Sequence, residues 1–517
     1  MQPRVITPRH RLRAAALVTA LALTMSVPTA SLAAGPTGFR TSVEAYITPA
    51  SPSVQVIPLI TVGEDADVDG FVFEGIPDGI GIAPVGGDTS LMDVYVTHEQ
   101  STVPFQNERD HQDSSVSRFR IDVSRPNRPV IVDASVPLGP EEGFIRFCSA
   151  FMAGPEHGFA NHTFLVNEES NDVIPVPAGA VYGSDPSVAP NRQAGYAVYL
   201  DTVTGVFDVL PNQGRHNHEN TVLVPGGWGS IVALSGDDTF TFPSTETRPN
   251  LSQLYMGLSA NEAAFKADDS TLWAFRVTDT GAPGFDPANP QNDGNDFFEI
   301  GTGDDWSGEF IQVPGDIARG ETADRPQDAL EDWSNANNVF QFIRVEDIAY
   351  DRTNPRVVYV ADTGNNRLVE STATGRLWRS SAGMASDGRI FRLEFNAEDP
   401  TVVDSFSVFA DSTDVGFAKP DNIDTSRKSL MVQEDNANAR IWRYNFEEPS
   451  WSVVATVNDP GGESSGIVDA SAWAGPGWWL VDVQAHGSDQ ETFSDPGVLP
   501  LVKREDGQLL LMRVPGS

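Results

Sequence analysis

The sequence contains almost no cysteine: Cys148 is the single one among 517 residues. A chain with one thiol forms no internal disulfide, so a protein of this size needs a large hydrophobic core. Positive charge is also scarce, with 34 lysines and arginines against 72 aspartates and glutamates and a net charge of −38. Such a balance repels nucleic acid and anionic membranes and attracts divalent cations. Much of the charge also fits a solvated acidic surface that keeps the protein in solution.

Long hydrophobic runs are missing except at the start of the chain. Four arginines (Arg4, Arg9, Arg11 and Arg13) accompany an apolar run over residues 12–27, which is followed by small residues at 31–34. This order predicts a secretory signal peptide over residues 1–34, cleaved near Ala33 or Ala34. The run is shorter than the ~20 residues that a membrane-spanning helix requires. We therefore expect a secreted or periplasmic monomer with no membrane span.

Helical periodicity is rare, and 45 glycines and 37 prolines divide the chain into short β-rich runs. The clearest runs are apolar almost throughout and end in a carboxylate; they cover residues 92–99, 162–169, 230–238, 356–362, 429–435 and 478–482. Strands of this kind are packed on both faces, as the inner strands of propeller blades are. The sequence thus predicts an all-β, six-bladed β-propeller over residues 35–517, with the carboxylate ends meeting at one mouth. A β-sandwich with a second β-domain is the alternative.

One stretch interrupts the pattern. Residues 278–337 are rich in Gly, Asp, Asn and Pro and poor in strand signals. We expect this stretch to be a long irregular insertion or lid loop within the single propeller domain.

An ordered series of short motifs resembles the secreted PhoX-like phosphatase family. It consists of residues 76–81 (IPDGIG), 96–99 (VTHE), 146–149 (RFCS), 164–169 (FLVNEE), 214–221 (GRHNHENT), 236–238 (GDD), 342–347 (FIRVED), 420–423 (PDNI), 433–435 (QED) and 482–486 (DVQAH). The resemblance runs from about residue 63 to the end of the chain. It implies a six-bladed propeller whose central mouth holds an iron pair and several calcium ions and hydrolyses phosphate monoesters.

The resemblance also assigns roles to individual residues. It implies that Glu168, Glu169, Glu219 and Glu346 are metal ligands and that Arg344 grips the phosphate, with Val345 in place of the family's proline. One position departs from the family pattern, because Asn167 stands where the resemblance places a cysteine ligand. Cys148 precedes it in a different predicted strand, and we do not expect it to substitute. Without that thiolate the ligand set favours calcium and makes iron doubtful.

The residues themselves support some of these roles. Side chains of Glu168 and Glu169 point to opposite sides of an extended strand, so both face the mouth only where the strand ends or bulges. Carboxylates gathered there repel one another unless a cation neutralises them, although a solvated turn is the alternative. Arg344 and Glu346 share one strand face, where the guanidinium either stabilises a transferring phosphoryl group or forms a structural ion pair.

Other candidate ligands lie at further strand ends. His218 is either a proton donor or a structural histidine. The oxygen ligands that calcium accepts are present at Asp421, Asn422, Glu434 and Asp435, which equally suit turn caps. We therefore expect a metal-dependent phosphomonoesterase acting on a small-molecule phosphate ester. The alternatives are a non-catalytic calcium-binding propeller that serves as an interaction module and a hydrolase of esters or lactones.

Overall fold

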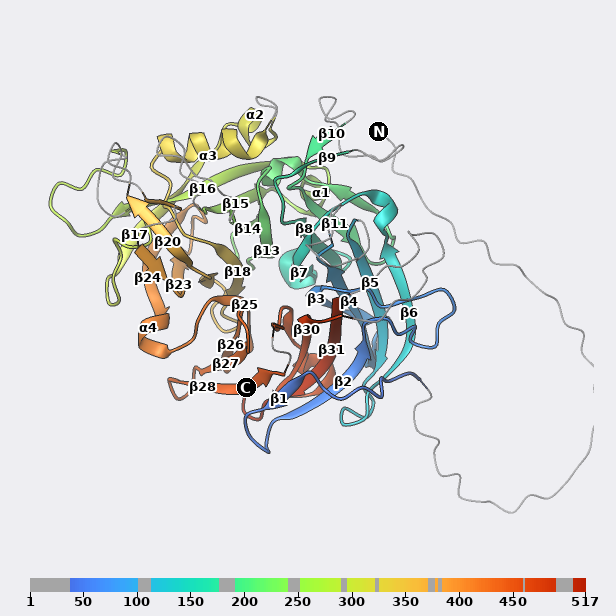
Figure 1. Ribbon diagram of the computed structural model, residues 1–517. Coiled ribbons are helices and arrows are strands. Elements are labelled where there is room, and N and C mark those ends of the chain that lie inside the picture. The colour runs from blue at the N-terminus through green and yellow to red at the C-terminus, as the bar shows by residue number, and fades with distance from the viewer. Residues whose placement is uncertain are drawn as a thin grey trace, which may run out of the picture.

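The computed structural model describes residues 38–100, 113–175, 191–239, 252–289, 295–320, 325–370, 377–379, 384–458, 461–489 and 505–517. Antiparallel β-sheets dominate these residues and surround a central region in a propeller-like arrangement (Figure 1). The all-β class and the propeller-like architecture that the sequence predicted are therefore confirmed. The predicted signal peptide, residues 1–34, lies outside the described residues, and no described helix is long and apolar enough to cross a membrane.

Four of the sheets have four or five strands each. The first contains β3 (Pro77–Val85), β4 (Asp88–His98), β5 (Ser115–Asp122) and β6 (Val130–Leu138). The second contains β7 (Phe147–Ala153), β8 (Thr163–Glu168), β11 (Ala197–Asp201) and β12 (Phe207–Val209). The third contains β25 (Pro420–Thr425), β26 (Ser429–Glu434), β27 (Arg440–Asn445), β28 (Ser450–Val457) and β1 (Ile47–Pro49). The fourth contains β29 (Ile467–Asp469), β30 (Trp478–Asp489), β31 (Glu505–Arg513) and β2 (Gln55–Thr61).

A nine-stranded sheet completes the arrangement. Its strands, in spatial order, are β13 (His218–Leu223), β14 (Ile231–Asp237), β15 (Leu254–Ser259), β16 (Ser270–Asp279), β17 (Trp306–Gln312), β24 (Val402–Asp411), β23 (Arg389–Phe395), β19 (Val357–Asp362) and β18 (Val345–Tyr350). The pairing of β17 with β24 joins its two halves. The end strands β13 and β18 also contact each other, so this sheet curls until it nearly closes.

Two short ladders and several short helices accompany these sheets. Two short ladders consist of β9 (Val173–Pro175) with β10 (Asn191–Gln193), and of β20 (Asn365–Glu370) with β21 (Leu377–Arg379) and β22 (Met384–Ser386). The helices are α1 (Glu262–Lys266), α2 (Gly315–Ala318), α3 (Pro326–Ala336), α4 (Ser412–Val415) and α5 (Ser471–Ala474), with 3₁₀ turns at Pro140–Glu142, Pro155–His157 and Pro211–Gln213. The stretch 278–337 thus contains β17, α2 and α3 in addition to irregular chain.

The innermost strands form a closed ring. Strands β3, β7, β13, β18, β25 and β29 contact one another in that order, and β29 contacts β3. The apolar runs identified in the sequence are not these strands. They form β4, β8, β14, β19, β26 and β30, each of which pairs with the innermost strand as the second strand of its sheet. The second strand is the more apolar one because the two neighbouring sheets cover both of its faces. The innermost strand instead lies along the central channel.

Apolar clusters fill the space between neighbouring sheets. Between the first two sheets, Tyr95 of β4 packs with Phe164 and Val166 of β8. Within the nine-stranded sheet, β14 and β19 contribute to one cluster because the sheet folds over on itself. This continuous apolar shell between sheets supplies the large core that a disulfide-free chain of this size requires.

The two ends of the described chain close the ring together. Strand β2 pairs antiparallel with β31, with Val56 opposite Met512 (Figure 1, where β2 is blue and β31 dark red). Leu59 of β2 is fully buried in the cluster that β2 and β31 share with the first sheet. An early strand therefore completes the last sheet.

Replacing Leu59 tests this closure. We expect Leu59→Ala to lower the free energy of unfolding by about 2–5 kcal/mol, because the lost side chain leaves a cavity at the junction. Guanidinium denaturation measures the change. Val203→Ala is the control, since Val203 is 71% exposed and its loss should change stability by no more than about 0.5 kcal/mol. Equal changes in the two variants would contradict the role assigned to β2.

Candidate functional site

Five innermost strands begin in the same way. Each pairs its first residue with the end of the second strand, and the register then shifts before pairing resumes; the first pairs are Pro77–His98, Phe147–Glu168, His218–Asp237, Val345–Asp362 and Pro420–Glu434. A bulge of this kind redirects the side chains of the residues inside it. The first residues inside the bulges are Asp78, Cys148, Glu219, Glu346 and Asp421. Strand starts and second-strand ends therefore converge at one edge of the ring.

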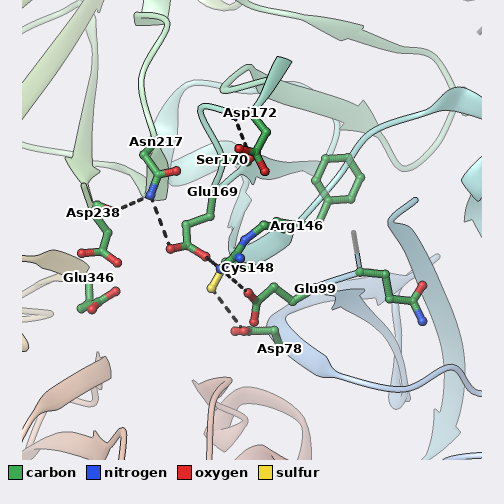
Figure 2. A network of polar contacts seen from close by, with 12 residues as sticks. Asp78, Glu99, Arg146, Cys148, Glu169, Ser170, Asp172, Asn217, Asp238 and Glu346 are labelled. Carbon is green, nitrogen blue, oxygen red and sulfur yellow. Dashed lines mark hydrogen bonds and ion pairs between the residues drawn. The ribbon is translucent and has the colours of Figure 1, made fainter. Parts of the chain in front are cut away.

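Cys148 lies at the centre of the acidic groups at this edge. Its Sγ and the carboxylate oxygens of Asp78 and Glu99 lie within 4.8 Å of one another, and the same holds for Cys148 with Glu169 and Glu219. The thiol donates a hydrogen bond to Asp78 Oδ2 at 3.3 Å (Figure 2). A third group, Asp421, Asp435 and Glu463, gathers within the same distance limit. We call all of these residues together with Glu346 the acidic mouth.

Arginine side chains are held against the carboxylates. Arg344 donates from Nε and Nη2 to the two oxygens of Asp238 at 2.8 and 2.6 Å, and its Nη2 lies 2.8 Å from Glu346. Asp238 is fully buried, whereas the Arg344 side chain keeps 20% exposure at the mouth. The carboxylate of Asp362 accepts the backbone N–H of Arg344 at 3.2 Å. The guanidinium is therefore fixed in direction while part of it faces solvent.

Arg146 is a second guanidinium held by carboxylates of the mouth. Its Nη2 lies 2.9 Å from Glu99 and 3.0 Å from Glu169, so one guanidinium joins both thiol-centred groups (Figure 2). His486 lies beside the third group, with Nε2 3.2 Å from Glu463 and Nδ1 2.5 Å from Glu505. Although burial opposes its charge, these contacts raise the pKa of His486 to about 12. These two carboxylates therefore favour the protonated imidazole of His486.

Several carboxyl groups of the mouth have raised pKa values. Burial raises the pKa of Asp78, Glu169, Glu219 and Glu346 well above the ordinary carboxyl value, and nearby carboxylates raise it further. Arg146 partly offsets this for Glu169, as Arg344 does for Glu346. Burial also raises the pKa of the Cys148 thiol. A bound divalent cation would reverse these shifts by favouring the ionised forms.

The donor set fits a metal. Asp78 Oδ1 is buried and accepts no hydrogen bond from any residue that the structure describes, which is costly for a carboxylate oxygen unless an ion contacts it. Converging carboxylate oxygens are the ligands of hard cations, and a thiolate among them suits a softer transition metal. These groups are thus able to hold metal ions.

A cavity of about 500 Å³ lies next to the acidic mouth, along the central channel. Its lining includes the residues that follow the mouth on the inner strands, among them Gly79, Ser149, Asn220, Asp347 and Asn422. Asn220 donates to Asp347 at 2.5 Å. These residues form a second, partly amide ring next to the carboxylates of the mouth.

The structure brings many of the predicted site residues together. Arg344, Glu169, Glu219, Glu346, Asp421 and Asp435 all lie at the mouth. Asn422 lies directly beside it, and in the amide orientation that satisfies both of its polar atoms it donates to Asp421 at 3.1 Å and to Ser465. Residues scattered over more than 250 positions of sequence thus share one edge of the ring.

Three predicted residues have protein partners instead. Glu168 is fully buried against Arg192 and also accepts the backbone N–H groups of Ile145 and Tyr196. Glu434 accepts from Arg440, from Trp442 Nε1 and from the backbone of Ala418. His218 uses Nδ1 for Ser235 and Nε2 for Gly214. In each case the contacts are those of a side chain that holds strands together.

Sequence reasoning missed Asp78, Glu99, Cys148, Asp238 and Glu463 as site residues. Cys148 was set aside because it precedes Glu169 in another strand, yet β7 and β8 are an antiparallel pair in which Phe147 lies opposite Glu168. The hairpin therefore returns the chain to the same edge. Asn167 donates to the backbone carbonyl of Glu219 at 2.5 Å. It therefore fixes the backbone of a mouth residue.

Comparisons with known proteins come from structure alone, since no family model and no curated protein sequence matches the chain. Pseudomonas fluorescens PhoX in complex with vanadate, a transition state analogue, matches with a TM-score of 0.63 and 15% identity over 92% of this chain and 97% of that one. The β-xylosidase RS223 matches with a TM-score of 0.30 and 9% identity over 84% and 91% of the two chains. This score is too low to show a shared fold. This chain therefore has the PhoX-like propeller fold that its ordered motifs predicted.

Proposed function

We propose that this protein is a secreted, metal-dependent hydrolase of phosphate monoesters that works at the acidic mouth. The observation that carries the proposal is the fixed, partly exposed guanidinium of Arg344 beside carboxylates that converge from separate strands. The fold similarity to PhoX, a structure with a bound vanadate described as a transition state analogue, supports a phosphate ester as the substrate class.

The donor groups suggest where cations bind. Asp421, Asp435 and Glu463 offer oxygen ligands alone and suit calcium. Cys148 adds sulfur to Asp78, Glu99, Glu169 and Glu219, so the thiol that Asn167 does not supply is present, and we include iron in the proposal beside calcium. Bound cations would supply Lewis acidity and neutralise phosphate charge.

The protein's own residues then have distinct tasks. Arg344 binds the oxygens of the phosphate group and stabilises the negative charge that develops on them during transfer. Asp238 and Asp362 orient Arg344, so that little reorganisation is needed when substrate binds. Arg146 bridges Glu99 and Glu169 and so holds both carboxylates at fixed positions. We assign no proton transfer to His218, because both of its ring nitrogens have partners.

The wider organisation belongs to the same proposal. We infer six blades, with the nine-stranded sheet made of two blades that the β17–β24 pairing merges. The ring of six contacting inner strands supports this count. Secretion rests on the N-terminal sequence, and a single domain over residues 35–517 rests on the closure between β2 and β31. N-terminal sequencing of exported protein tests the cleavage near Ala33 or Ala34.

Cation binding should stabilise the protein more as pH rises. The raised pKa values of Asp78, Glu169, Glu219 and Glu346 mean that the cation-free protein gains stability below the ordinary carboxyl pKa and loses it as pH rises through the folded-state pKa. A cation removes that loss. We expect calcium at 100 times its dissociation constant to add about 2.7 kcal/mol, with a larger increase in Tm at pH 8 than at pH 5.

Thermal melts in calcium and in chelator measure this effect. Glu219→Gln should reduce the calcium-dependent increase in Tm, whereas Glu398→Gln, at an exposed position, should leave it unchanged. Metal analysis of the purified protein identifies the ion. An increase in Tm that is absent, or that is equal in both variants, would contradict cation binding at the mouth.

Changing Arg344 tests catalysis. Because Asp238 is fully buried, Arg344→Ala would leave an unpaired carboxylate and destabilise the protein as well. Arg344→Lys retains the charge but loses the paired hydrogen bonds. We expect it to lower kcat/KM for p-nitrophenyl phosphate by roughly 10²-fold with little change in Tm.

Arg276→Lys is the matched control. Arg276 on β16 pairs with Glu309 at 2.5 Å, outside the mouth, and its variant should hydrolyse the ester at the wild-type rate. If the wild-type protein binds calcium but hydrolyses no phosphate ester with any metal supplied, the protein is instead a calcium-binding propeller without turnover.

A further inference from the structure

Helix α3, within the stretch 278–337, inserts a glutamine behind the acidic mouth. Gln327 is 1% exposed. Its Oε1 accepts the backbone N–H of Asn217 at 2.6 Å. Its Nε2 lies 2.9 Å from Thr239 Oγ1, 3.0 Å from Glu331 Oε1 and 3.2 Å from Asp237 Oδ2. One side chain therefore contacts the residue before β13 and the residues at the end of β14.

The partners of Gln327 adjoin Asp238, whose carboxylate holds Arg344. Asp238 lies between Asp237 and Thr239 in sequence, and its backbone N–H donates to Asn217 O at 3.0 Å. Asn217 Nδ2 in turn donates to Asp238 O and lies 3.5 Å from Glu169 Oε1 (Figure 2). A displacement of Asn217 would therefore move both Asp238 and a carboxylate of the mouth.

The chemistry of the position calls for an amide. Nε2 donates toward two carboxylates, Asp237 and Glu331, while Oε1 accepts a backbone N–H. A glutamate has the same shape but no donor, and it would place a third carboxylate among two others in a buried place. A methionine has similar length and can neither donate nor accept well.

We propose that Gln327 is a positioning residue through which helix α3 fixes the Asp238–Arg344 pair, so that this helix determines how tightly the mouth binds a phosphate ester. The positioning stands on these contacts alone, whereas the effect on phosphate esters rests on the proposed function. Gln327 itself lies behind the mouth and acts through Asn217 and Asp238.

Kinetics of Gln327→Met and Gln327→Glu test the proposal. Displacement of a positioned group by about 1 Å costs up to 10²-fold, and we expect each variant to lower kcat/KM for p-nitrophenyl phosphate about tenfold, mainly through KM. In the Arg344→Lys background, the same changes should cost less than about threefold, because coupled residues are not additive. Additive losses in both backgrounds would overturn the proposal.

Ser334→Ala is the matched control on the same helix. Ser334 is buried and contacts Tyr255 OH at 3.0 Å, away from the mouth. This variant loses one buried hydrogen bond of α3 and should retain kcat/KM within about twofold. A loss equal to that of Gln327→Met would show that general docking of α3, and not Gln327, sets the affinity, and would overturn the proposal.

Amide hydrogen exchange separates this inference from the proposed function. The N–H groups of Asn217 and Asp238 should exchange about tenfold faster in Gln327→Met than in the wild type or in Ser334→Ala. This measurement needs no substrate. A wild-type protein without phosphatase activity but with this exchange pattern would refute the phosphatase and retain the positioning. Unchanged exchange at both amides would refute the positioning.

Discussion

Repulsion among buried carboxylates is the constraint on which the acidic mouth depends. Asp78, Glu219 and Glu346 lie on different strands and Glu169 follows β8, yet burial and nearby carboxylates raise the pKa of each. A cluster of ionised carboxylates is unfavourable, and the positive charges of Arg146, Arg344 and His486 offset the repulsion only in part. The fold must therefore hold these side chains together by other means, and cations from solution are the natural complement.

The apolar shell between the sheets holds these carboxylates together. Second strands such as β8 and β14 are buried throughout, so their register with the innermost strands is fixed by packing. Each bulge at the mouth then has a defined position, with the acid or thiol as its first residue. Stability is thus provided between the sheets, while the charged groups that oppose it are confined to one edge of the ring.

Sequence patterns predicted the all-β class, the propeller and several mouth residues, because apolar strands with carboxylate ends are local features. They misassigned these strands to the innermost place, since an innermost strand such as β25 (PDNIDT) faces a channel and carries polar residues. Glu168 and Glu434 were chosen for their positions at strand ends, and only the three-dimensional contacts show Arg192 and Arg440 beside them. Cys148 was missed because antiparallel pairing, which brings β7 beside β8, is not visible from distance along the chain.

The stretch 278–337 shows how an irregular segment becomes part of such a site. Its sequence predicted an insertion or lid, and its described part also contributes β17, which joins two halves of a sheet, and α3, which packs behind the mouth. A loop that only covered the mouth would need no buried amide, yet Gln327 lies among Asp237, Glu331 and the backbone of Asn217. A buried amide with partners at both its oxygen and its nitrogen holds those partners at fixed positions. Those partners adjoin Asp238, so the insertion and the guanidinium of Arg344 belong to one hydrogen-bonded unit.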